Sequence, residues 1–371
     1  MNENAKRVIL SRAVAALLAA SLVPSVSAAQ LADALTPPAV VQEAEVQQTE
    51  QTLESAAEEK ELQQVQEVRQ EAAALAAEGS LQAQIDAAEN GVEKRITLQG
   101  EVSEDLKIPA GKNIVLELAA GSKLTNVSGH TITNNGTLTI EGTGTVDNLT
   151  HQKAAIYNNE GGTVILNGGT YTRSHEKGAD ANNSGGNSYY NIVNWGKMTI
   201  NNGAEVKSNG HYSSLIENGF YNGTGKTTNP KLTINGGTFS GGLNTVKNDD
   251  RGVLEIKNGT FTNVSQAAVL NWNEATIEGG TFTANDKAAA VILNGHIDDD
   301  ADQGKLTITG GTFTGTGNTN IIQQMDASGA DALGTVTISG GTFETETGEI
   351  FSLKTGPEDK ATIQLSGGKF A

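Results

Sequence analysis

The 371-residue sequence contains no cysteine, only six prolines and few aromatic residues, which make up 4% of the chain. The missing cysteines exclude a disulfide framework, a cysteine-ligated zinc site and a thiol nucleophile. Lys and Arg together number 25 against 43 Asp and Glu, so the formal net charge is −18. A nucleic-acid-binding protein needs clustered basic residues to neutralise phosphates, and this excess of acid argues against such a partner.

Long apolar runs are also missing, with one short exception at the N-terminus. Three basic residues precede an apolar stretch over residues 13–23, and the small residues Val26-Ser27-Ala28 follow it. A membrane-spanning helix needs about 20 apolar residues, so a membrane anchor is the weaker alternative. The pattern predicts a signal peptide over residues 1–28. We therefore expect a secreted, extracellular protein, either free or associated with the cell surface, with no membrane span after cleavage.

Residues 29–79 differ in composition from everything that follows them. Residues 30–90 carry thirteen acidic and two basic side chains, and residues 39–78 are rich in Glu, Gln and Ala. Apolar positions are too sparse for a sustained heptad seam, which favours an exposed helical or disordered stalk. Oligomerisation through a coiled coil in this stalk is the alternative, and like-charge repulsion weakens it.

A repeat fills most of the remaining sequence. Nine segments carry two apolar residues separated by one position, and in seven of them an aromatic residue follows seven positions after the first apolar one. Six of the eight Phe residues of the chain occupy this slot. The aromatic slot residues are Tyr171, Phe239, Phe261, Phe282, Phe313, Phe343 and Phe370.

Glycine and asparagine punctuate the repeat at fixed places. A Gly-Gly pair, such as Gly310-Gly311, separates the apolar pair from the aromatic residue and indicates a tight corner. A second short apolar segment lies upstream of each pair and commonly ends in Asn, as in Ile216-Glu217-Asn218. The repeating unit is therefore strand, corner, strand, glycine corner, strand and loop.

One such unit cannot bury its apolar face alone, whereas stacked units can. Successive units are 21 to 34 residues apart, which suits one turn of a three-faced β-solenoid. A β-propeller is the competing architecture, but its four-stranded blades need about 40–50 residues each. The sequence predicts an all-β, right-handed parallel β-helix of about ten coils over residues 80–371.

The start of this region predicts a cap. Ser80 suits the N-cap of a short helix with Leu81, Ile85 and Ala88 on one face, which would cover the first rung. With the segment Ile108-Pro109-Ala110-Gly111-Lys112 and the Gly-Gly-Thr-Phe repeats, the chain resembles bacterial secreted and surface proteins with a pectate-lyase-like right-handed parallel β-helix. The resemblance implies that fold. It leaves function open, since the group includes polysaccharide lyases, glycoside hydrolases and non-enzymatic adhesins.

Residues for catalysis are sparse in the repeat. The outward positions between the upstream apolar residue and its Asn include one acidic side chain, Glu217, so no row of carboxylates is expected there. The five histidines fall in different units, and we interpret them as surface residues. Asp249, Asp250 and Arg251 could form an acid pair beside a base, an alternative that we keep open.

Several loops after the Asn corner are acidic. Clustered carboxylates can bind calcium, which takes six to eight oxygen ligands, and Asp298, Asp299, Asp300 and Asp302 form the densest cluster. A solvated, mutually repelling edge that keeps the solenoid soluble is the simpler interpretation. Beyond calcium at this cluster, we expect no cofactor.

Two insertions, at 173–190 and 219–229, interrupt the middle of the stack. Loops on a rigid solenoid commonly carry recognition residues. Aromatic residues outside the core slot gather in and beside these insertions: Tyr189, Tyr190, Trp195, Tyr212, Phe220 and Tyr221. Sugars stack on such rings, so this is the predicted ligand-binding surface.

The sequence thus favours an exported, adhesin-like scaffold that binds a polysaccharide or a host or bacterial glycan through its central loops. A polysaccharide lyase or glycoside hydrolase is the alternative, and a purely structural stalk is the third. The repeat continues to Ala371 without a polar cap, so we expect either more chain beyond it or an open end that docks against a partner.

Overall fold

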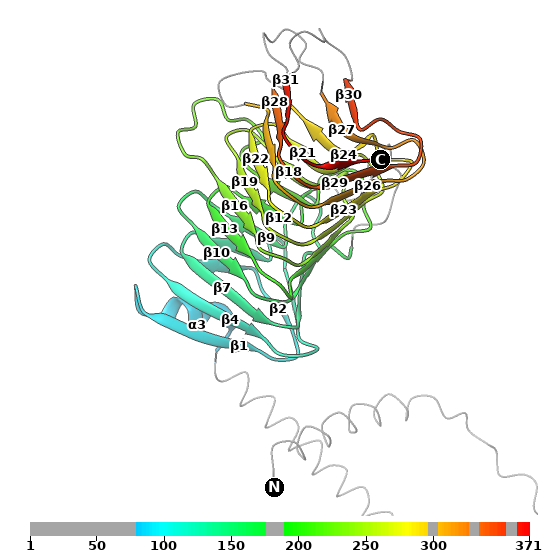
Figure 1. Cartoon of the computed structure of the whole chain (residues 1–371). Coiled ribbons are helices and arrows are strands. Elements are labelled where there is room, and N and C mark those ends of the chain that lie inside the picture. The colour runs from blue at the N-terminus through cyan, green and yellow to red at the C-terminus, as the bar shows by residue number, and fades with distance from the viewer. Residues whose placement is uncertain (1–78, 176–188, 296–302, 326–333, 354–361) are drawn as a thin grey trace, which may run out of the picture. The chain divides into compact units, whose positions relative to one another are not determined.

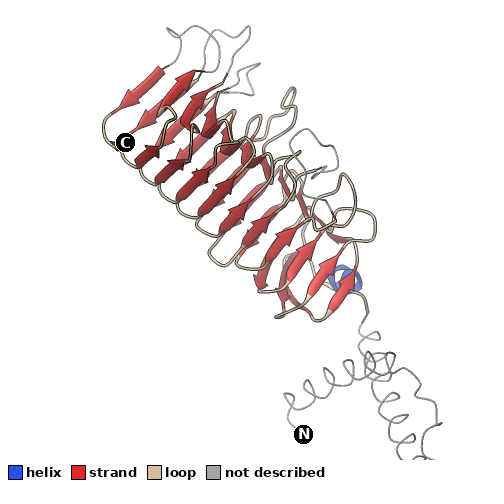
Figure 2. Cartoon of the chain, turned by 90° about the vertical axis from the view of Figure 1, so that its right-hand side faces the viewer, coloured by secondary structure: helices blue, strands red, loops and turns tan. Residues whose placement is uncertain are grey.

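The computed structural model describes residues 79–175, 189–295, 303–325, 334–353 and 362–371. The expected signal peptide and nearly all of the expected stalk lie outside these residues. From Leu81 to Ala371 the chain forms one compact unit. Each complete coil of this unit contributes one strand to each of three parallel sheets, and successive coils stack along one axis (Figures 1 and 2).

Sheet A follows the asparagine corner and contains eleven described strands in chain order. These are β1 (Glu93–Leu98), β4 (Asn113–Leu118), β7 (Thr137–Gly142), β10 (Thr163–Leu166), β13 (Lys197–Ile200), β16 (Lys231–Ile234), β19 (Val253–Ile256), β22 (Glu274–Ile277), β25 (Lys305–Ile308), β28 (Thr335–Ile338) and β31 (Thr362–Leu365).

Sheet B follows the glycine corner and also has eleven described strands. These are β2 (Glu101–Ser103), β5 (Lys123–Thr125), β8 (Thr145–Asp147), β11 (Thr170–Thr172), β14 (Glu205–Lys207), β17 (Thr238–Ser240), β20 (Thr260–Asn263), β23 (Thr281–Ala284), β26 (Thr312–Gly315), β29 (Thr342–Thr345) and β32 (Lys369–Phe370).

Sheet C precedes the asparagine corner and has ten described strands. These are β3 (Leu106–Ile108), β6 (Ile132–Asn134), β9 (Ile156–Asn158), β12 (Ile192–Asn194), β15 (Ile216–Asn218), β18 (Asn244–Asn248), β21 (Ala267–Asn271), β24 (Ala290–Asn294), β27 (Asn320–Gln324) and β30 (Phe351–Leu353).

The predicted parallel β-helix is confirmed, with one correction to its length. The sequence predicted about ten coils, and sheets A and B each hold eleven described strands. The segments at 96–98 and 114–118 look degenerate in sequence, but they form β1 and β4 in full register with the later strands. Stacking tolerates a weak repeat because each strand needs only apolar residues at its inward positions.

The predicted aromatic ladder forms the core beneath sheet B. The rings from Phe239 to Phe370 stack with centroids 4.6–5.0 Å apart and planes within 11° of parallel. This spacing equals the distance between neighbouring strands, so register alone aligns the rings. All are buried except Phe370, the last in the stack, which is 41% exposed.

Tyr171 occupies the same column two coils before Phe239. It pairs with Val146 on one side and Val206 on the other, and its hydroxyl donates to the Gly168 carbonyl at 2.7 Å. In the coils of Val146 and Val206 the corner is one residue longer, which places valine at the inward position. The seven-residue spacing therefore misses these two rungs.

The glycine corners are required by sterics. Gly311 adopts a φ of +106°, which residues with a Cβ rarely adopt. A Cβ on the preceding Gly310 would lie 2.3 Å from the Glu278 carbonyl oxygen of the coil below. Each Gly-Gly pair thus lets the chain turn while touching the corner beneath it.

The asparagine corners form a continuous amide ladder. Each buried Asn donates from Nδ2 to the side-chain oxygen of the residue in the next coil, at 2.7–2.8 Å. The members are Asn134, Asn158, Asn194, Asn218, Asn248, Asn271, Asn294 and Gln324. Because the amides also donate to nearby backbone carbonyls, the ladder satisfies polar groups that the corner would otherwise bury unpaired.

The predicted N-terminal cap is also present. Helix α3 (Leu81–Ala87) buries Leu81 and Ile85, and Ala88 just beyond it, against the first coil. The Glu104 carboxylate accepts hydrogen bonds from the Leu81 and Gln82 amides at 3.1 and 3.0 Å, so a residue of the first coil helps to cap the helix. None of the described helices has the length and apolar composition that crossing a membrane requires.

Candidate functional site

The outer face of sheet C differs from an ordinary solvated face. Val193, Glu217, Lys247 and Leu270 occupy successive outward positions on β12, β15, β18 and β21, pointing away from the core. None of the four is more than 7% exposed. Burial of a glutamate and a lysine on the outside of a solenoid is costly, which makes this face the candidate site.

Six aromatic side chains form a connected group on this face, which we call the aromatic band. Tyr157 on β9 lies between His130 and Trp195, with ring centroids 4.4 and 5.1 Å away. Trp195 contacts Phe220 at 5.6 Å, and His130 contacts Tyr189 at 6.0 Å. Tyr189 in turn packs on Tyr190 at 5.3 Å. The band therefore extends across coils that are distant in sequence.

The sequence found four members of this band and missed two. Tyr189, Tyr190, Trp195 and Phe220 were predicted as ligand contacts and do come together. Tyr157 and His130 were missed, although Tyr157 stands at an outward position one coil below Val193, a signal that register could have supplied.

Burial and contacts distinguish the predicted residues from one another. Phe220 is only 1% exposed, so it supports the band from beneath rather than contacting a ligand. Tyr212 and Tyr221 are 48% and 76% exposed, and Tyr221 lies instead near the Lys247 ammonium, 5.7 Å from its ring centroid. His130 is not a simple surface residue, because its Nδ1 accepts a hydrogen bond from the Ala154 amide at 2.8 Å.

His130 is held neutral by its surroundings. Burial, together with the positive charge of Lys153, lowers the pKa of His130 to about 4. Its accepting Nδ1 leaves the proton on Nε2, so the ring can donate one hydrogen bond at neutral pH. A neutral imidazole next to the Tyr157 and Tyr189 rings suits contact with hydroxyl groups better than ion pairing.

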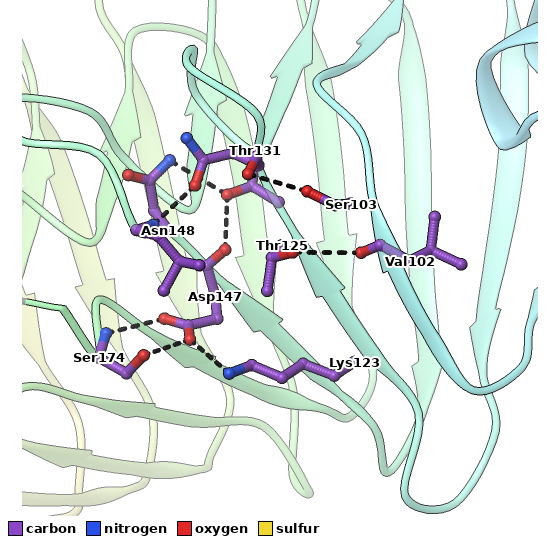
Figure 3. Close-up of polar contacts among 10 residues, drawn as sticks. Val102, Ser103, Lys123, Thr125, Thr131, Asp147, Asn148 and Ser174 are labelled. Atoms are coloured by element: carbon purple, nitrogen blue, oxygen red, sulfur yellow. Dashed lines mark hydrogen bonds and ion pairs between the residues drawn. The ribbon is translucent and has the colours of Figure 1, made fainter.

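Figure 3 shows how the base of the 173–190 insertion is anchored. The Asp147 carboxylate is fully buried at the end of β8. It accepts a hydrogen bond from the Ser174 amide at 2.8 Å and another from the Ser174 hydroxyl, and it pairs with Lys123 Nζ at 2.8 Å. The insertion therefore leaves the solenoid from a fixed point.

Arg173 ties the two ends of the same insertion together. The side chain is 1% exposed, and its guanidinium donates to the carbonyls of Lys153 at 2.6 Å, Tyr189 at 2.8 Å and Thr150 at 3.2 Å. Bonds from a buried cation to three carbonyls are strong and directional. As a result, Tyr189 and Tyr190 re-enter the solenoid at a defined position over Glu217.

A buried acid pair lies beneath the band. Glu217 on β15 is within hydrogen-bonding reach of the Asp249 carboxylate and of the Tyr190 hydroxyl. Burial and the neighbouring Asp249 raise the pKa of Glu217 well above its ordinary value. The surroundings of Glu217 agree with this raised pKa, because its Oε1 is buried and accepts no hydrogen bond from the described residues. A proton held between the two carboxyls removes the repulsion that two buried negative charges would create.

Lys247 decides which acid keeps the charge. Its Nζ lies 2.5 Å from Asp249 Oδ2 and 4.0 Å from the centroid of the Trp272 ring. Burial raises the pKa of Asp249, and Lys247 opposes that rise. We therefore assign the proton to Glu217 and the negative charge to Asp249.

The outward strand positions carry no row of carboxylates, and the second acid of this pair comes from a corner instead. Counting only strand positions found Glu217 alone, because Asp249 follows the asparagine corner after β18 and comes back over the neighbouring strand. The alternative grouping of Asp249, Asp250 and Arg251 is not what forms. Instead, Asp250 Oδ2 accepts a hydrogen bond from the Gly223 amide at 2.6 Å, and its carbonyl accepts one from the Phe220 amide at 3.0 Å, so it anchors the second insertion.

All four residues of the predicted calcium cluster, Asp298, Asp299, Asp300 and Asp302, lie outside the described residues. Among the residues that are described, no group of three or more His, Asp or Glu side chains is arranged to hold a metal ion.

Fold and site together define the class of this protein: a right-handed parallel β-helix with an aromatic band over a buried acid pair. Comparison with known protein families, with curated proteins and with solved structures found no significant match. The resemblance to pectate-lyase-like secreted proteins therefore remains a prediction from the repeat motifs.

Proposed function

We propose that this protein is an exported, adhesin-like scaffold that binds a polysaccharide or glycan through the aromatic band. The observation that carries the proposal is the chain of ring contacts from Tyr189 through His130 and Tyr157 to Trp195. These four side chains are half-buried, so each fixes its ring by packing and still presents part of it to solvent. Rigid aromatic surface with nearby polar groups is what sugar recognition uses.

Glycan-array binding of the secreted chain tests this proposal. We expect retention of at least one glycan class, and a loss of at least tenfold in affinity for both Trp195→Ala and Tyr157→Ala, because each removes a large rigid contact surface. Tyr212→Ala removes an exposed tyrosine that is not a member of the aromatic band and serves as the matched control. Absence of binding to every glycan would favour a structural stalk, whereas glycan binding that survives both band substitutions would contradict the aromatic band as the contact surface.

The buried acid pair favours one second candidate, cleavage of a glycosidic bond. Acid-assisted glycoside hydrolysis uses one protonated and one ionised carboxyl, although the two groups there stand about 5–9.5 Å apart rather than within hydrogen-bonding reach. Against it, Glu217 and Asp249 are 2% and 0% exposed, so a substrate would reach them only after Tyr190 moved. Binding without cleavage is therefore the function that the geometry supports better.

Product analysis separates the two candidates. The protein is incubated with uronate-containing and neutral polysaccharides, with and without calcium, and reducing ends and ultraviolet-absorbing unsaturated products are measured. We expect no turnover. Release of products that Glu217→Gln abolishes, while Tyr212→Ala leaves it intact, would make the protein an enzyme.

A further inference from the structure

A shallow groove of about 290 Å³ adjoins Trp195 at the corner between sheets C and A. Its lining includes the Trp195 ring, two lysines and the glycines Gly161, Gly162 and Gly196. A Cβ added to Gly161 would meet nothing within 4 Å, so the space beside it is open. The volume is at the small end of ligand pockets and suits about one sugar ring.

The two lysines stand on neighbouring strands and face this groove, and neither can neutralise the positive charge of the other. Lys197 on β13 is directly opposite Lys231 on β16 in the parallel register. Lys231 Nζ pairs with Glu255 at 2.7 Å, whereas Lys197 is exposed and makes no ion pair within the described residues. Like charges directly opposite each other on a sheet are destabilising, so Lys197 is unfavourable for folding and available to an anion.

The surrounding charges reinforce this positive site. Lys226 pairs with Glu160 and lies 5.4 Å from the centroid of the Trp195 ring. The Arg251 Nε donates to the Thr228 carbonyl at the groove wall, at 3.1 Å. In and beside this groove there are two acidic side chains, Glu160 and Glu255, and four basic ones. The basic side chains are Lys197, Lys226, Lys231 and Arg251. The groove is therefore locally basic in a chain whose net charge is −18.

Trp195, which lines the groove, also carries a buried polar atom. Its indole Nε1 is buried and has no acceptor among the described residues. Leaving a buried donor unpaired costs free energy.

We propose that this corner groove binds a single acidic sugar unit, with its carboxylate or sulfate on Lys197 and its ring beside Trp195. The inference rests on the proposed glycan-binding function and adds the charge class of the ligand. One unpaired lysine suits a singly charged sugar. The overall charge of −18 disfavours a densely charged polyanion such as nucleic acid.

Calorimetric titration of the secreted chain with sialyllactose, sulfolactose and neutral lactose tests the proposal. We expect at least one acidic sugar to bind about tenfold more tightly than lactose, as a charge-assisted contact provides, and to weaken with added salt. Comparing the carboxylate sugar with the sulfate sugar identifies the anionic group. Lys197→Gln should abolish the preference for the acidic sugar over lactose. Lys287→Gln removes a lysine from the exposed turn between β23 and β24 and should change nothing.

The outcomes distinguish this inference from the proposed function. Equal affinity for acidic and neutral sugars, or a preference that survives Lys197→Gln, overturns the inference and leaves glycan binding intact. Array binding that depends on Trp195 but shows no acidic preference likewise overturns the inference alone. Absence of binding to every glycan overturns both.

Discussion

Among the individual residues, the buried pair of Glu217 and Asp249 is the least expected feature of the chain. A solenoid normally keeps its outward carboxylates in water, where each one ionises freely. Here the strand register puts Glu217 beside Lys247, and the following corner returns Asp249 over it. Because Lys247 neutralises only one negative charge, the second acid is accommodated by keeping its proton.

The shared proton predicts a specific dependence of stability on pH. A carboxyl whose pKa is raised by folding binds its proton more tightly in the folded protein than in the unfolded chain. The contribution of Glu217 to stability is therefore complete below the ordinary glutamate pKa of about 4.3 and is lost as the pH rises toward the folded value. Glu217→Gln mimics the protonated acid, so it should melt higher than the parent by a few degrees at about pH 8, and this difference should vanish near pH 4.

Thermal melts of both proteins over that pH range measure the effect. Glu278→Gln changes an exposed glutamate and is the control. His130 acts in the opposite direction, since its lowered pKa costs stability as the pH falls from about 6.5 toward 4, but it affects parent and variant equally. A constant difference between parent and Glu217→Gln at every pH would contradict the shared proton.

Among the structural elements, the corners distinguish this solenoid more than the strands do. The strands are short and similar to one another, and each is positioned by its pairing with the strands of the adjacent coils. The asparagine ladder binds adjacent coils through side chains as well as backbone, and the glycine corners permit the close contact on which the phenylalanine stack depends. The insertion at 173–190 lies in the connection from sheet B to sheet C, where Asp147 and Arg173 hold its ends. The insertion at 219–229 follows an asparagine corner and is anchored by Asp250 from the asparagine corner of the next coil.

The ladder makes a testable contribution to stability. Asn271 donates to Asn294 Oδ1 at 2.7 Å and to the Lys305 carbonyl at 3.1 Å, and it accepts from Asn248 Nδ2 at 2.8 Å, all in the buried corner. Asn271→Ala should lower the free energy of unfolding by about 2–4 kcal/mol, because it leaves several buried groups unpaired. Asn235 donates to Asn201 Oδ1 at 2.8 Å in a half-buried corner on the other side of sheet A, and Asn235→Ala should cost less than about 1 kcal/mol.

Chemical denaturation of the two variants compares them directly. Equal losses would show that the ladder is no stronger when buried than when partly exposed to water.

In the molecule as a whole, the stacked core and the proposed recognition surface are formed by different side chains. The core is a column of stacked identical side chains, and it can be lengthened or varied without changing the outer faces. The proposed recognition surface lies on one side, where the outer face of sheet C meets the described ends of the central insertions and the corner groove. The remaining faces consist mainly of threonine and charged side chains that suit a solvated parallel sheet.

Local spacing along the chain was enough to predict the repeat, the three-strand coil, the capping helix and the identity of the stacked residues, because identical units must align when they stack. It also indicated that aromatic side chains cluster around the central insertions. Spacing could not show that Tyr157 and His130 complete the band, that Phe220 is buried beneath it or that Asp249 meets Glu217. Those contacts join residues from different coils across insertions of unequal length, and the distance between them depends on how each corner returns to the stack.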